Sequence, residues 1–171
     1  HGLRPEADDD LRFVTDLAAE CGVGFVADRL AVRSSVGNGG EGLEARARRL
    51  RYDWFGRVVH ERGARHLLVA HTADDQAETI LHRILRGTSV AGLAGMKPAR
   101  RFVDGVALLR PMLGLRRADV RAFLVARGLS WREDASNADP RFARAFLRHE
   151  VLPKLEGAAW PAATAALVRL G

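Results

Sequence analysis

A short apolar run leads directly into an acidic, amphipathic segment in the middle of the sequence. The run "ARHLLVAHT", residues 64–72, has the length and aliphatic content of a buried strand. From Ala73 to about Arg86, before Gly87, apolar residues recur at helical spacing. The predicted apolar face of this helix consists of Ala77, Ile80, Leu81, Ile84 and Leu85. A buried strand followed at once by a helix favours an α/β fold.

The remaining segments continue this alternation. Further helices are predicted over residues 5–22, 43–63, 116–128, 140–156 and 161–171. A strand is predicted over residues 23–32, and a hairpin over residues 100–111 that turns at Asp104–Gly105. We therefore expect a mostly parallel sheet with flanking helices. The expected domains are residues 1–135 and a small helical extension over residues 136–171.

Composition limits the class of protein. Hydrophobic residues make up 47% and charged residues 28%, which suits a soluble globular chain. No apolar run approaches the roughly 20 residues of a membrane span, and the opening "HGLRPEADDD" lacks a signal-peptide pattern. Cys21 is the only cysteine, which excludes an intramolecular disulfide and a cysteine-rich metal site and favours the cytoplasm. The net charge of +6 indicates either a polyanionic partner or an arginine-favouring base composition.

Three carboxylates gather where the predicted helix begins. Thr72 can cap the helix, and acidic residues in a first turn favour the helix dipole, which explains Asp74. Asp75 and Glu78 lie three residues apart on one face, away from the apolar stripe. Such a pair can bind Mg²⁺, position an amine or act as a general base. This pair is therefore the first candidate for chemistry.

Several motifs together resemble a known family. "AHTADDQAET" followed by "RGTSVAGLAGM" resembles the second signature of the N-type ATP pyrophosphatases. Within that group, the segments "HGLRPE", "LEARARRLRYDWF", "LLRPMLGLRRADVRAFL" and "WREDASNADPRFARAFLRHEVLPKL" resemble the tRNA(Ile)-lysidine synthetases, in that family's order. The resemblance implies a Rossmann-like fold of the adenine nucleotide alpha hydrolase type.

The resemblance also implies a reaction. Members of the family adenylate the C2 oxygen of the wobble cytidine of tRNA(Ile) with ATP and Mg²⁺. The amine of free lysine then attacks C2 and displaces AMP. Asp75 matches an acidic residue for Mg²⁺–ATP or for the lysine amine, and Glu78 a second lysine or metal contact. His71 matches the motif histidine at the nucleotide, although a helix-entry hydrogen bond is an equal alternative.

Arginines carry the remaining implied contacts. Arg144 and Arg148 match family arginines that face ATP or the tRNA. Arg48 and Arg51 become candidates for phosphate or lysine-carboxylate contacts, although their spacing is also that of an ordinary solvated face. Asn137 matches the polar connector and is expected to organise its turn.

The sequence also departs from the family. No "S-G-G-x-D-S" loop occurs, so we expect a chain that begins after the first βα unit, and no lysidine formation by these 171 residues alone. The sheet edge that the missing strand would leave could pair in a homodimer. Alternatives are a 2-thiocytidine synthetase, disfavoured by the single cysteine, a non-catalytic RNA-binding module and a plain nucleotide-binding sensor.

Overall fold

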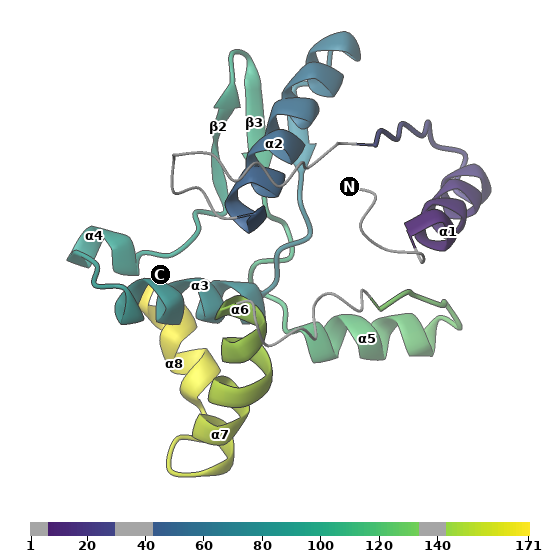
Figure 1. Ribbon diagram of the computed structural model, residues 1–171. Coiled ribbons are helices and arrows are strands. Elements are labelled where there is room, and N and C mark those ends of the chain that lie inside the picture. The colour runs from purple at the N-terminus through teal and green to yellow at the C-terminus, as the bar shows by residue number, and fades with distance from the viewer. Residues whose placement is uncertain (1–6, 30–42, 134–142) are drawn as a thin grey trace. The chain divides into compact units, whose positions relative to one another are not determined.

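The computed structural model describes residues 7–29, 43–133 and 143–171 (Figure 1). Contacts within the chain divide it into two compact units, His1–Ala64 and Arg65–Gly171, and each is described by itself. The predicted domain boundary at residues 135–136 lies outside the described residues.

The described part of the first unit contains two helices, α1 (Ala7–Glu20) and α2 (Leu43–Glu61). Three aspartates in the first turn of α1 complement its dipole. Gly63 follows α2 with a φ of +61°, a conformation that glycine adopts without strain. Both predicted helices are therefore confirmed.

The strand predicted over residues 23–32 is wrong for the part that can be seen. Residues 23–29 are not part of a strand, because they lack the backbone pairing that defines one. Alternating apolar residues suit a strand, but a strand forms only when a neighbour completes its backbone hydrogen bonds. Arg57 and Asp28 lie 3.9 Å apart and form an ion pair within this unit.

The second unit contains a small sheet. Its strands are β1 (His66–Leu68), β2 (Ala99–Val103) and β3 (Val106–Leu109), in the order β1-β3-β2. β1 runs parallel to β3, and β2 runs antiparallel to it, so the two described pairings are of different kinds. The predicted hairpin turn is confirmed at Asp104–Gly105, where Gly105 has a φ of +70°.

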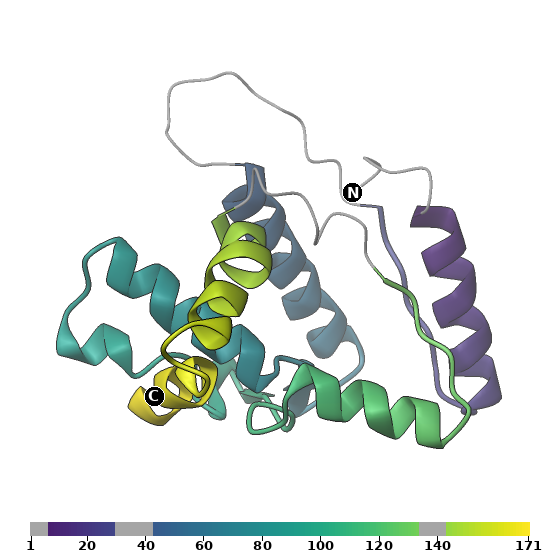
Figure 2. The same cartoon turned by 90° about the horizontal axis from the view of Figure 1, so that it is seen from below.

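Helices of the second unit gather around α3 (Ala73–Leu85), with α8 (Ala163–Leu170) beside it (Figures 1 and 2). The short α4 (Val90–Leu93) follows α3, and α5 (Arg117–Ala126) follows the hairpin. The α/β class with a helical C-terminal segment is thus confirmed. No helix among the described residues is long and apolar enough to cross a membrane.

The C-terminal helical segment is not a regular α-helix. It consists of α6 (Ala143–Phe146), the π-helical turn η2 (Leu147–Val151) and α7 (Leu152–Gly157). The sequence predicted one continuous helix through these residues, because hydrophobic spacing does not distinguish a single π-turn. Such turns are rare and occur frequently at functional sites. Here the π-turn carries Arg148.

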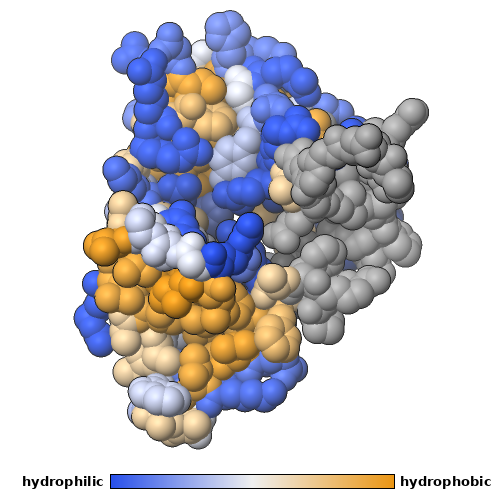
Figure 3. All heavy atoms as spheres, turned by 60° about the vertical axis from the view of Figure 1, so that its left-hand side comes forward, coloured by the Kyte–Doolittle hydropathy of each residue, from blue (hydrophilic) through white to orange (hydrophobic). Residues whose placement is uncertain are grey.

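The core of the second unit lies under the first half of α3. Ala77 and Ile80 are fully buried there, as is Leu108 of β3. The predicted apolar face is not buried at the C-terminal end of α3, where Ile84 is 42% exposed and Leu85 is 66% exposed. Figure 3 shows apolar side chains gathered on one face of the molecule around the C-terminal helices.

Two side chains of α3 fasten the loop around α4. The amide of Gln76 donates to the carbonyl of Met96 over 3.2 Å and accepts from its N–H over 2.7 Å. Arg83 donates to the carbonyls of Gly92 and Gly95 over 2.8 and 2.9 Å. These contacts fix the glycine-containing loop that the sequence places after α3.

Candidate active site

The start of α3 is capped as the sequence predicted. Thr72 Oγ1 accepts from the amide of Asp75 over 3.4 Å, and Asp75 Oδ2 accepts from the amide and the hydroxyl of Thr72, both over 2.8 Å. This reciprocal capping box satisfies donors that a helix start leaves unpaired. One oxygen of Asp75 therefore has a structural role, which leaves Oδ1 for other partners.

Asp74 caps a different helix from the one that contains it. Its Oδ2 accepts from the backbone N–H of Arg117 over 2.7 Å, and its Oδ1 accepts from Nε of Arg116 over 3.2 Å. Asp74 stands in the first turn of α3, as the sequence predicted, and its contact with α5 is a second role. Its carboxylate binds the first turn of α5, more than forty positions along the chain. Sequence spacing could not show this contact, because it depends on tertiary packing.

Two guanidinium groups converge on Glu78. Arg148 donates from Nε to Oε1 over 2.6 Å and from Nη2 to Oε2 over 2.9 Å. Arg117 Nη2 lies 3.5 Å from Oε1 of Glu78 and 3.2 Å from Oδ1 of Asp75. Arg148 Nη2 also lies 3.2 Å from Oδ1 of Asp75. Asp75 and Glu78 thus share the same two arginine partners, while their role in chemistry stays a prediction.

The burial of the Glu78 carboxylate requires a charged partner. Glu78 is only 2% exposed, and an unpaired carboxylate at such a depth would cost several kcal/mol of folding free energy. Its hydrogen bond with Arg148 is the largest cause that raises the pKa of that guanidinium above its ordinary value, while burial acts in the opposite direction. Glu78 and Arg148 therefore form an ion pair in which the carboxylate is almost fully buried.

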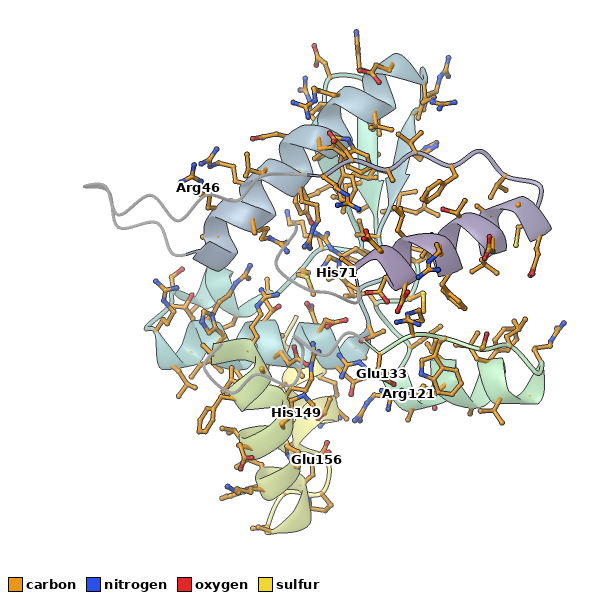
Figure 4. The ribbon with its side chains drawn as sticks, turned by 45° about the vertical axis from the view of Figure 1, so that its right-hand side comes forward. Arg46, His71, Arg121, Glu133, His149 and Glu156 are labelled. Carbon is orange, nitrogen blue, oxygen red and sulfur yellow. The ribbon has the colours of Figure 1, made fainter. Side chains whose placement is uncertain are left out.

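The wider cluster balances its charges. Three carboxylates of α3 face three arginines from α5, its N-cap and the π-turn: Asp74, Asp75, Glu78, Arg116, Arg117 and Arg148. Arg116 extends the network to Glu156 of α7, 3.9 Å away. Figure 4 labels Glu156 on that helix. Every oxygen of the Asp74, Asp75 and Glu78 carboxylates thus already accepts from a protein donor.

This donor set does not fit a magnesium ion in the arrangement observed. Among the residues that the structure describes, no three His, Cys, Asp or Glu side chains gather as a metal site. A divalent cation at Asp75 would also lie against the guanidinium groups of Arg117 and Arg148. The assignment of Asp75 as a metal ligand therefore stays a prediction from resemblance alone.

The other predicted residues of the second unit lie near the two ends of the cluster. His71 is half-buried and directly precedes the N-cap of α3, after β1 has ended (Figure 4). Arg144 is half-buried on α6, four positions before Arg148 in the chain. Their roles at the nucleotide remain predictions.

The predicted substrate contacts belong to the first unit or lie outside the described residues. Arg48 and Arg51 are exposed on α2 in the first unit. The guanidinium of Arg48 stacks over the ring of Tyr52 at 4.8 Å and donates to its hydroxyl over 3.2 Å. Asn137 lies outside the described residues, so its expected place in the connector is a prediction.

Sequence reasoning missed Arg116 and Arg117, yet a signal was present. Both stand at the start of a helix, where the dipole disfavours positive charge. Two cations at such a position break a local rule, and broken rules often mark functional sites. The helix also has an exposed ion pair further along, between Arg121 and Glu133 over 2.6 Å, which Figure 4 labels.

The chain is similar in sequence to proteins of known name. The chain is 46% identical over 169 residues to a tRNA(Ile)-lysidine synthase of Thermus thermophilus, covering 99% of this chain and 32% of that protein. It is 45% identical over 170 residues to one of Deinococcus radiodurans, covering 99% of this chain and 28% of that protein. It therefore spans about a third of the length of these relatives.

A solved structure supports the fold. The U34-tRNA thiolase of Methanococcus maripaludis, which holds a [4Fe-4S] cluster, matches with a TM-score of 0.72. The match covers 95% of this chain and 54% of that one, at 16% sequence identity. Identity at this level indicates a shared fold only. Residues 1–155 also match the PP-loop domain family, and the chain therefore belongs to that family.

Proposed function

We propose that the protein containing this chain is a tRNA-modifying ligase that joins lysine to C2 of the wobble cytidine of tRNA(Ile), using ATP. The observation that carries the proposal is the pairing of Asp75 with the buried Glu78, in a chain that is 46% identical to a protein named for this product. The chain spans about a third of such relatives, so the activity belongs to the whole protein.

The reaction has two balanced steps. The C2 oxygen of the cytidine attacks the α-phosphate of ATP, and pyrophosphate leaves. The lysine amine then loses a proton and attacks C2, a C–N bond forms, the C–O bond breaks and AMP departs. At neutral pH the amine is an ammonium, so the second step needs a nearby carboxylate that can hold it and accept its proton.

Asp75 and Glu78 supply that carboxylate chemistry. An ammonium donates hydrogen bonds to the same oxygens that accept from Arg117 and Arg148, so it can replace one guanidinium without leaving Glu78 unpaired. Release of Arg148 would free a guanidinium with the geometry that matches phosphate. The site would thus exchange a protein cation for a substrate cation.

The remaining contacts are assigned by resemblance. His71, Arg144 and Arg148 are proposed at the nucleotide or tRNA, and Arg48, Arg51 and Asn137 at the substrates. Mg²⁺ is proposed to accompany the triphosphate of ATP, and no step needs it on Asp75. ATP, lysine and tRNA meet in the cytoplasm, where we place the protein, and a homodimer stays a prediction.

Mass spectrometry of digested tRNA tests the proposal. The complete natural protein is incubated with ATP, lysine and a tRNA(Ile) transcript with cytidine at the wobble position. We expect lysidine only when all components are present, and none on a transcript with uridine at that position. A complete protein that binds ATP and tRNA but forms no lysidine would contradict the proposal and favour the non-catalytic alternative.

A further inference from the structure

We infer that Asp74 and Arg117 form a positioning unit that sets the geometry of the two carboxylates, Asp75 and Glu78. The unit is built from a carboxylate on α3 and the first residue of α5. It rests on the proposed function for its role in lysine transfer, while its structural part can be tested without activity.

The first step fixes the start of α5. The backbone N–H of Arg117 is one of the donors that a helix start leaves without an intrahelical partner. Asp74 accepts it over 2.7 Å and also accepts from Arg116 over 3.2 Å. The side chain of Asp74 is 18% exposed, so solvent competes little for these bonds. A negative charge here also offsets two cations that the dipole disfavours.

The second step returns from α5 to α3. With its backbone held by Asp74, Arg117 directs one nitrogen, Nη2, toward both carboxylates of the pair. It lies 3.2 Å from Asp75 Oδ1 and 3.5 Å from Glu78 Oε1. Two carboxylates one helical turn apart repel each other, and a shared cationic donor draws them to a fixed separation.

In the third step, Arg117 and Arg148 have different roles. Arg148 engages both oxygens of Glu78 and comes from the π-turn, while Arg117 comes from α5. When an ammonium takes the place of Arg148, Arg117 still bridges the carboxylates. Arg117 is therefore the positioning residue, and Asp74 acts through it.

Variants of Arg117 in the complete natural protein test this inference. Arg121→Gln is the matched control, because Arg121 lies one turn further along α5 and pairs with Glu133 at the surface. In single-turnover lysine transfer we expect Arg117→Gln to lose on the order of 100-fold in rate, with the KM for tRNA within about twofold. Arg117→Lys should recover about tenfold of the loss, since an ammonium can also bridge two carboxylates.

Two results with the Arg117 variants would contradict the inference. If Arg117→Gln transfers lysine as fast as Arg121→Gln, or if Arg117→Lys is as slow as Arg117→Gln, the positioning role is wrong. Thermal unfolding of each variant shows whether the fold is retained. The conservative Lys variant keeps the test valid if the Gln variant proves unstable.

A spectroscopic measurement is independent of activity. The Nε–H of Arg148, which donates to Glu78 over 2.6 Å, should give a slowly exchanging nitrogen-15 signal that Arg148→Lys removes. We expect its exchange to accelerate at least about fivefold in Arg117→Gln and to be unchanged in Arg121→Gln. No change in Arg117→Gln overturns the inference. A changed signal in a protein that forms no lysidine would contradict the proposed function alone.

Asp74→Ala tests the order of the steps. Because Asp74 acts through Arg117, it should slow lysine transfer in the natural background and add no further loss to Arg117→Gln. Losses that multiply in the double variant would show that Asp74 acts independently and would contradict the positioning unit.

Discussion

Arg148 binds Glu78 through two nitrogens, although the two residues are seventy positions apart in the chain. The distances are 2.6 Å from Nε to Oε1 and 2.9 Å from Nη2 to Oε2. Such bidentate pairs are among the stronger contacts in proteins and fix both partners in orientation. The pair therefore ties the C-terminal π-turn to the acidic start of α3.

Glu78→Gln should destabilise the fold. The change leaves the guanidinium of Arg148, whose side chain is only 19% exposed, without its main charged partner. Breaking one side of a buried pair costs about 3 kcal/mol, so we expect a loss of about 2–4 kcal/mol in the free energy of unfolding. Urea denaturation followed by circular dichroism measures it.

Glu133→Gln is the matched control for that loss. Glu133 also binds an arginine, but its side chain is 65% exposed. An exposed pair contributes at most about 1 kcal/mol. Equal losses for the two variants would show that the buried pair has no special weight.

The pH dependence of stability distinguishes Arg148 from a lysine. Its pKa is raised above the ordinary value, chiefly by the hydrogen bond to Glu78. Its contribution to stability is therefore complete below the unfolded-state pKa of arginine and is lost only as pH rises through the still higher folded-state pKa. Lysine ordinarily titrates at about 10.4, so Arg148→Lys should lose further stability relative to the natural chain as pH rises above about 10. A pH-independent difference would contradict this.

Gly95→Ala should disrupt the loop around α4. Gly95 has a φ of +58°, and an added Cβ would lie 2.5 Å from Nε2 of Gln76, which binds Met96. We expect a loss of about 2–3 kcal/mol, from backbone strain and the broken amide contact together. Gly105→Ala has a similar φ, +70°, but meets no atom within 4 Å, so it should lose only about 1 kcal/mol. If Gly95→Ala and Gly105→Ala had the same unfolding midpoint, the hydrogen bonds between Gln76 and Met96 would not stabilise this loop.

Thr72→Ala should remove the cap of α3. The hydroxyl of Thr72 accepts from the amide of Asp75 and donates to its carboxylate. Loss of a cap costs about 1 kcal/mol, whereas Thr72→Ser keeps the hydroxyl and should stay within about 0.5 kcal/mol of the natural chain. Denaturant unfolding of the two variants checks the difference, and an equal loss in both would argue against the capping box.

The sequence predicted the local parts of the site well. Capping by Thr72 and the shared face of Asp75 and Glu78 follow from helix geometry, which depends only on spacing. The hairpin turn and the glycines that follow α2, α3 and α5 are likewise local. These features need no knowledge of what packs where.

The contacts between residues that are far apart in the chain could not be predicted from sequence spacing. The contact of Asp74 with α5 joins residues more than forty positions apart. The ion pairs of Glu78 with Arg148 and of Asp75 with Arg117 likewise join residues that are far apart in the chain. The exposure of Ile84 and Leu85 has the same origin, because periodicity shows which residues share a face but not what covers it.

The most direct measurement separates the two chemical steps in the complete natural protein. Pyrophosphate release reports adenylation, and lysine incorporation reports the attack on C2. Glu78→Gln should retain pyrophosphate release and lose lysine incorporation by on the order of 100-fold, while Glu133→Gln retains both. Lysine incorporation by Glu78→Gln at the natural rate would contradict a role for the buried acidic pair in the ligation.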